Sequence, residues 1–132
     1  MIWHGEALVA RVEQGARRGV QAGIGIIEQH WVDLLTTGSR SGRVYRRRGV
    51  AHQASAPGEP PASDTGNLLN SRIIELIPDE IAARMRITAA YAPHLEYGTK
   101  NMEPRPSARV AASGSAPDVR NAILFEVRMA LQ

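Results

Sequence analysis

The sequence predicts an α+β fold in which a long N-terminal helix and a C-terminal helix pack on a small antiparallel sheet, with a long extended loop. Three observations lead to this class: an apolar stripe of helical period in residues 5–36, two short alternating segments within residues 71–90, and a second helical stripe in residues 118–131. The loop over residues 36–64 separates the first helix from the sheet. A chain of 132 residues corresponds to one domain, residues 1–132.

The first helix is predicted because apolar side chains recur at steps of three or four over residues 5–36. The interior of this helix also contains Gly15, Gly19, Gly23 and Gly25, each of which costs about 1 kcal/mol relative to Ala. The first three, spaced by four, line one narrow strip. Either packing tolerates these glycines, or another element or a neighbouring subunit approaches the backbone closely there. The apolar stripe itself consists of Leu8, Val12, Ala16, Val20, Ile24, Ile27, Trp31 and Leu35.

The loop over residues 36–64 is irregular because prolines and glycines interrupt it repeatedly. Its middle, "RVYRRRGVAHQA", is expected to be extended or to form one arm of a hairpin. Residues 36–53 contain five arginines and no acidic residue, whereas the rest of the chain carries 11 basic and 13 acidic side chains. The basicity is therefore local. The arginines are Arg40, Arg43, Arg46, Arg47 and Arg48.

The second half of the chain predicts a short sheet followed by helices. Asp64 and Thr65 form a capping pair ahead of one short turn in "GNLLNS". "SRIIELIP" and "EIAARMRITAA" are read as two strands, joined by a turn at Pro78-Asp79-Glu80. In these strands, Ile74, Leu76, Ala83, Met85 and Ile87 alternate with Glu75, Arg84, Arg86 and Thr88.

Two further helices are expected after the strands. A short helix begins near Pro93 and ends at Gly98. The following segment is read as a loop that admits a short helix after Pro106. The closing helix runs over Asp118–Leu131 and starts at Pro117 or Asp118.

The sequence offers little chemistry for catalysis or cofactor binding. No cysteine is present, which excludes thiolate metal sites, and the four histidines are widely separated. None of the glycine-rich nucleotide-binding or zinc-protease motifs occurs. Glu96 and Glu103 are the only candidate carboxylate pair for hydrolysis, and only because they are close in sequence. We expect Glu96 instead to accept hydrogen bonds from backbone N–H groups or to pair with Arg105.

Several blocks of sequence occur in a fixed order: Ala56-Pro57-Gly58-Glu59-Pro60-Pro61, Asp64-Thr65-Gly66, Leu68 with Ser71, Tyr91-Ala92-Pro93, Leu95-Glu96-Tyr97-Gly98-Thr99, and Met102 with Arg105-Pro106. Together they resemble a family of small tailed-phage proteins, the neck or minor tail components encoded between the head genes and the major tail-tube gene. The resemblance covers about residues 50–107, and the long N-terminal helix fits it too. The family commonly continues after Arg-Pro with an aromatic residue and a second Arg-Pro-Ala, whereas here Ser107-Ala108-Arg109-Val110-Ala111 follows.

The resemblance implies a structural virion protein and no enzyme or cofactor. It implies a ring, usually six-fold, that joins the DNA-filled head to the tail tube as a tail-completion or tail-terminator protein. The implied partners are further copies of the chain, head-closure or connector proteins, and tail-tube or tail-terminator proteins. DNA passes through the lumen without sequence-specific binding, and no membrane is involved. The expected location is the virion neck or tail, after assembly in the bacterial host cytoplasm.

Within this interpretation, two groups of residues receive roles. The expected ring or partner interface comprises Arg40, Arg43, Arg46, Arg47, Arg48, Pro57 and Glu59. The expected structural motif comprises Tyr91, Pro93, Glu96, Tyr97, Gly98, Thr99, Arg105 and Pro106, with Gly98 at a positive φ and Glu96 holding the turn. The alternative is a nucleic-acid-binding accessory protein whose Arg40–Arg48 loop contacts phosphates in a salt-dependent manner. Two other interpretations of that loop are docking on an acidic partner protein and plain solvation.

Overall fold

The α+β class is confirmed: long N- and C-terminal helices pack with a small two-stranded antiparallel sheet. The computed structural model describes residues 4–37, 44–47, 50–53, 66–101 and 103–132. Its elements, in chain order, are α1 (Gly5–Thr37), β1 (Val44–Arg47), β2 (Val50–Gln53), α2 (Asn67–Asn70), β3 (Arg72–Leu76), β4 (Ala83–Ile87), α3 (Ala92–Tyr97) and α4 (Ala108–Ala130).

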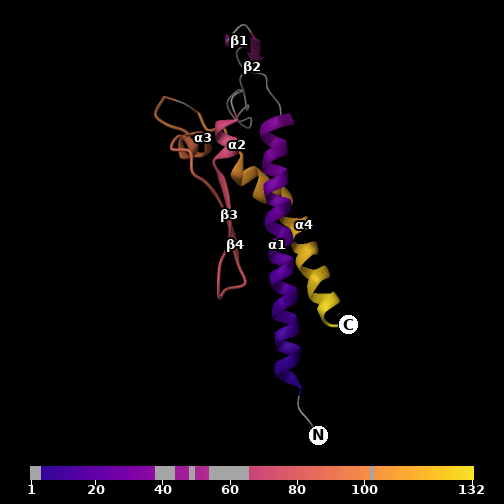
Figure 1. Cartoon of the computed structure of the whole chain (residues 1–132). Helices are drawn as coiled ribbons and strands as arrows, with labels where there is room; N and C mark the ends of the chain where they lie inside the picture. Colours follow the sequence, from indigo (N-terminus) through magenta and orange to yellow (C-terminus); the bar gives the residue numbers. More distant parts are fainter. Residues whose placement is uncertain (1–3, 38–43, 48–49, 54–65, 102) are drawn as a thin grey trace.

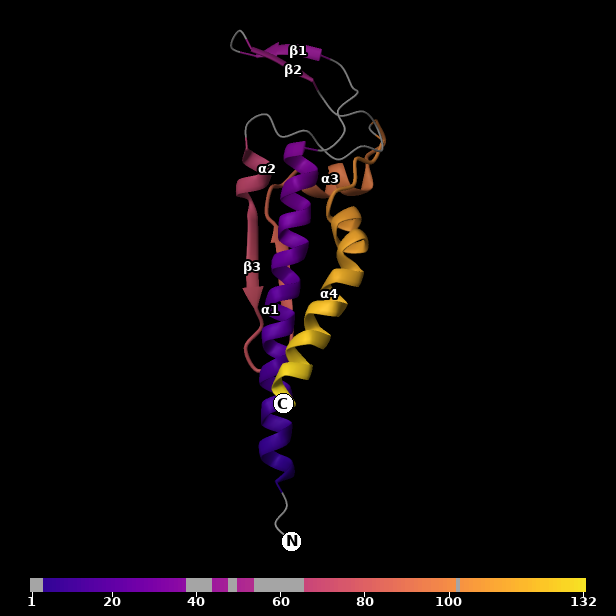
Figure 2. The same cartoon turned by 90° about the vertical axis from the view of Figure 1, so that its right-hand side faces the viewer.

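Helix α1 is the central element of the described structure. The β3–β4 hairpin lies along one side of it and α4 along the other, in both views (Figures 1 and 2). The two chain ends lie toward the same end of the molecule, where an Arg11 Nη2 donates to the Gln132 carbonyl oxygen at 2.5 Å. The short α2 and α3 lie at the opposite end, and the β1–β2 hairpin lies beyond the C-terminal end of α1. None of the described helices is both long and apolar enough to cross a bilayer.

The predicted strands are observed as β3 and β4, which pair antiparallel. Ile74 lies opposite Met85, and Glu75 lies opposite Arg84. The Glu75 carboxylate pairs with Arg84 and Arg86, both at 2.9 Å, so the charged side chains share one face as the alternation predicts. Leu76, expected on the packed face, is 51% exposed.

A small core lies where α1, α4, α2 and the sheet converge. Trp31, Leu35 and Ala111 are completely buried. Half-buried apolar side chains of α1, α2 and β4 pack around them, namely Ile27, Val32, Leu34, Leu68, Leu69, Met85 and Ile87. Nearer its N-terminus, α1 presents glycines to larger residues of α4.

The glycine strip of α1 is a close-approach seam with α4. A Cβ built on Gly19 would lie 2.6 Å from the Ile123 Cα, and one on Gly15 would lie 2.8 Å from the Glu126 carbonyl oxygen. A Cβ on Gly23 would lie 2.8 Å from the Val119 Cγ1. The expectation of a close backbone approach is therefore confirmed, and the approaching element belongs to the same chain.

The structure corrects the predicted start of the last helix. Helix α4 begins at Ala108 and is continuous, so the segment expected to be a loop, or to hold a short separate helix after Pro106, is the first part of α4. Pro117 lies inside the helix, where it removes one backbone donor. The Ser113 carbonyl oxygen would have accepted a hydrogen bond from that backbone N–H. Ser113 is exposed, so water can donate to this oxygen instead. Figure 2 shows that α4 bends along its course.

The region around the basic loop also differs from its prediction. Its middle forms both arms of an antiparallel hairpin, with Tyr45 opposite His52, where at most one arm was expected. The short helix α2 is present as predicted, but its N-cap is Gly66, in the left-handed conformation with φ 77°. The predicted capping residues Asp64 and Thr65 lie outside the described residues.

Candidate functional site

The motif that resembles the phage family forms a short helix and its stop. Pro93 lies in the first turn of α3, where its fixed φ suits the helix and its missing N–H is not needed. Gly98 ends α3 with φ 79° and ψ 175°, and its N–H donates to the His94 carbonyl oxygen at 2.9 Å. The predicted positive φ at Gly98 is thus confirmed. This combination of angles is essentially restricted to glycine.

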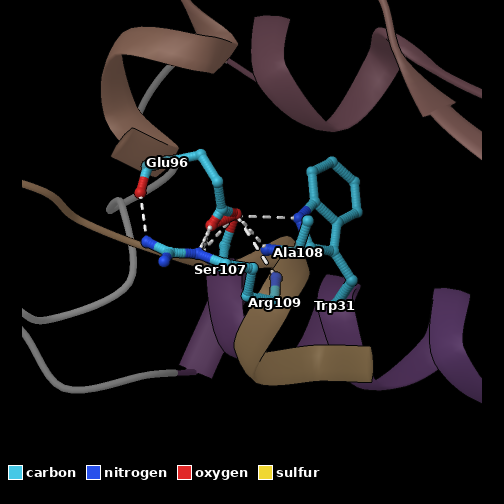
Figure 3. Close-up of polar contacts among 5 residues, drawn as sticks. All are labelled: Trp31, Glu96, Ser107, Ala108 and Arg109. Carbon is cyan, nitrogen blue, oxygen red and sulfur yellow. Dashed lines mark hydrogen bonds and ion pairs between the residues drawn. The ribbon is translucent and has the colours of Figure 1, made fainter. Parts of the chain in front are cut away.

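The Glu96 carboxylate caps the first turn of α4 from the neighbouring α3 (Figure 3). Its Oε1 accepts hydrogen bonds from the backbone N–H groups of Ser107, Ala108 and Arg109 at 3.2, 2.7 and 3.4 Å. The Oε2 also accepts from the Ser107 N–H at 3.2 Å. These are N–H groups that a helix leaves without internal partners, and the carboxylate also complements the positive end of the helix dipole. The expectation that Glu96 binds backbone N–H groups is confirmed.

Arg109 adds a second connection between the two helices. Its Nε lies 3.4 Å from the Glu96 Oε2, and an Nη2 donates to the Glu96 carbonyl oxygen at 2.5 Å. The guanidinium carbon stands 5.2 Å from the centre of the Tyr97 ring, within range of a cation–π contact. The Arg109 side chain is 54% exposed, whereas the Glu96 side chain is 12% exposed. The ion pair therefore contributes little compared with the shielded carboxylate–amide hydrogen bonds.

Trp31 connects this cap to the core. Its indole Nε1 donates to the Ser107 Oγ at 3.0 Å, and both residues are buried (Figure 3). Ser107 is the N-cap residue of α4, but its hydroxyl makes no capping hydrogen bond of its own. The cap is instead supplied across space by Glu96. One buried cluster thus ties α1, α3 and the start of α4 together.

The other predicted motif residues surround the cap in supporting positions. The Arg105 N–H donates to the Leu95 carbonyl oxygen at 2.6 Å, which brings the Pro-Arg-Pro segment back onto α3. The Thr99 Oγ1 accepts from the Asn101 N–H at 3.3 Å. Tyr91 is the N-cap of α3 and is largely exposed, and Pro106 is half-buried just before α4.

A pocket of about 250 Å³ opens beside the cap, with a mostly apolar lining that includes Leu68, Met85, Ile87 and Leu95. Glu96 also lines it, but its carboxylate oxygens are held by the start of α4. Among the described residues, no group of three or more histidine, aspartate or glutamate side chains is placed to bind a metal ion. The arrangement is that of a structural cap.

The predicted interface residues are placed only in part. Arg46 and Arg47 lie on β1, opposite Ala51 and Val50 of β2. The others lie outside the described residues, namely Arg40, Arg43, Arg48, Pro57 and Glu59.

Sequence reasoning missed three members of the cap cluster: Trp31, Ser107 and Arg109. A serine directly after Pro106 and before a run of small residues is a recognisable N-cap signal for Ser107. Trp31 has its role through Ser107, 76 residues away along the chain, and Arg109 has its role through Glu96, 13 residues away. No local sequence pattern indicates such tertiary contacts.

Comparisons with protein-family models, with curated proteins and with solved structures found no match for this chain. Its function is therefore inferred from the motif blocks and from the geometry described above.

Proposed function

We propose that this protein is a structural subunit of a ring at the neck of a tailed phage, where it joins the DNA-filled head to the tail tube. The role is that of a tail-completion or tail-terminator protein, placed in the virion after assembly in the host cytoplasm. The motif blocks support this proposal through their resemblance to that family. The capping role of Glu96 supports it as well, because the most distinctive part of the motif then shapes the subunit and carries out no reaction.

The observation that carries the proposal is the amount of apolar surface that the described residues leave in water. Among the described residues only four apolar ones are buried, whereas large apolar side chains are exposed on both long helices and on the β3–β4 hairpin. Phe125 is 59% exposed and Val9 56%. Apolar side chains gathered on a surface mark sites of protein association, because burying them contributes about 25 cal/mol per Å². A subunit whose surfaces are covered by neighbours accounts for this distribution.

A ring built from one chain uses two different surfaces, front and back, repeated by rotation. The remaining surfaces would contact the head-closure or connector protein on one side and the tail-tube or tail-terminator protein on the other. The DNA passes through the lumen, and we assign the basic β1–β2 region to contacts with the neighbouring neck proteins.

Native mass spectrometry, on the purified chain and on the chain mixed with the tail-tube protein of the same phage or prophage, tests the proposal. We expect closed oligomers, with a six-fold ring as the main species. A chain that stays monomeric in both samples would refute the proposal. A gel-shift titration with salt provides the comparison: DNA affinity that falls steeply with salt, without association with the tail-tube protein, supports a nucleic-acid-binding accessory protein instead.

A further inference from the structure

Helix α4 borders an apolar groove with α1. The groove is lined by Ile27 of α1 and, on α4, by Ala116, Val119, Ile123 and Leu124. Arg120 is the charged residue in this lining, and it is exposed. Because the lining positions of α4 recur at steps of three and four, they form one side of the helix. The groove therefore offers an apolar floor with a single cation at its edge.

A different side of α4 carries an exposed apolar ridge. Phe125 and Met129 are 59% and 47% exposed and lie one helical turn apart. Phe125 follows Leu124 directly, so its side chain leaves the helix about 100° further round than that groove residue. Asp118 precedes Phe125 by seven residues, on the same side of the helix, and is exposed. The ridge thus consists of two large apolar side chains with an anion at one end.

We propose that the ridge of one copy, made by Asp118, Phe125 and Met129, docks into the α1–α4 groove of a second copy. The two surfaces match in polarity, and Asp118 of the ridge has the sign opposite to that of Arg120 of the groove. Asp118 of one copy would then face Arg120 of the next, while Phe125 enters the groove.

This arrangement rests on the ring function proposed above and specifies its subunit contact. Ridge and groove are different surfaces of one chain, so their contact is heterologous and repeats from copy to copy until the rotation closes a ring. A two-fold dimer would instead require each surface to meet itself. Phe125 is the expected anchor, since large aromatic side chains that fill a groove dominate the energetics of most interfaces.

Charge reversal tests the contact. We expect Asp118→Arg and Arg120→Asp each to weaken self-association about tenfold, and the double variant to restore it to near the original value, since the pair is re-formed with its signs exchanged. Phe125→Ala should weaken it about thirtyfold or more. Gln14→Arg is the control, because Gln14 is exposed on α1 and belongs to neither surface. The measurement is native mass spectrometry over a range of chain concentrations, with circular dichroism to verify folding.

Crosslinking tests the front-to-back geometry independently. The chain contains no cysteine, so Ala116→Cys marks the groove and Met129→Cys marks the ridge without background. A short bis-maleimide linker should join the two variants when they are mixed, and should join neither variant efficiently to itself. Such mixed products support the proposal.

The outcomes separate this inference from the ring function. Rings that persist in the Asp118, Arg120 and Phe125 variants overturn the ridge–groove contact and leave the ring intact as a function. Variants that keep self-association but lose the tail-tube protein also overturn it, because the surface then binds that partner. A wild-type chain that never associates overturns both proposals.

Discussion

Replacing Gly19 by alanine should separate helices α1 and α4 and destabilise the fold. The new Cβ would lie 2.6 Å from the Ile123 Cα, a backbone atom that cannot rotate away. The helices must therefore part locally by roughly 1 Å, which costs about 1–3 kcal/mol in lost contacts and strain even though alanine favours the helix. Urea or thermal unfolding followed by circular dichroism measures this loss, which we expect to lower the melting temperature by several degrees.

Gly25 provides the matched control in the same helix. A Cβ there has nothing within 4 Å, so Gly25→Ala should gain about 1 kcal/mol from helix propensity alone. The two identical substitutions, six residues apart, should thus differ by about 2–4 kcal/mol in the free energy of unfolding. Gly23→Ala should fall between them, because it meets the Val119 Cγ1, an atom that can turn away. Equal stability of the Gly19 and Gly25 variants would refute the close-approach reasoning.

Three further predictions concern the cap and its turn. Glu96→Ala should lower the free energy of unfolding by about 2–3 kcal/mol, because it leaves shielded N–H groups of the first turn of α4 without acceptors, and Glu96→Gln should recover part of this in denaturant titrations. Gly98→Asn should lower the free energy of unfolding by about 1–3 kcal/mol and impair ring assembly, because the backbone angles of Gly98 lie outside the left-handed region that asparagine accepts. Gly66 lies inside that region, so Gly66→Asn should be tolerated. Equal melting temperatures of the two variants would contradict this. Trp31→Phe should cost about 1–3 kcal/mol, since it removes the donor to the Ser107 Oγ, and hydrogen exchange at the start of α4 should accelerate.

Much of the fold followed from periodicity. The apolar stripe predicted α1 to within a residue at its end, and the alternation in β4 placed Ala83, Met85 and Ile87 on the packed face. Both signals come from local patterns that burial enforces directly. The glycine spacing predicted a close approach, but it could not identify α4 as the partner, because no local pattern encodes which distant helix arrives.

The largest error, the start of α4, has a clear physical cause. Pro117 was read as a first-turn residue, since proline usually begins a helix. Here the exposed position of Ser113 lets water replace the hydrogen bond that Pro117 removes, so the helix continues through it. The prediction therefore breaks α4 at Pro117 or Asp118, and it treats the part from Ala108 onward as a loop that admits only a short helix. In the candidate site, the sequence predicted that Glu96 accepts hydrogen bonds from backbone N–H groups. It did not predict that the Ala108 N–H is one of them, because the start of α4 at Ala108 was not predicted.

The glycine seam also determines which alignment of the two long helices is possible. Val119 packs against Gly23, and Ile123 packs against Gly19. If α4 slid by one helical turn, about 5.4 Å, each of these side chains would face the α1 residue four positions before or after its present partner. In one direction Val119 meets Ile27, and two bulky side chains collide. In the other direction glycines would admit the slide, but the hydrogen bond between Trp31 and Ser107 anchors α4 at its first turn. The helices therefore have one register: bulk blocks a slide in one direction, and a slide in the other breaks the Trp31–Ser107 hydrogen bond and the 2.8 Å hydrogen bond between His30 Nδ1 and the Ser115 Oγ.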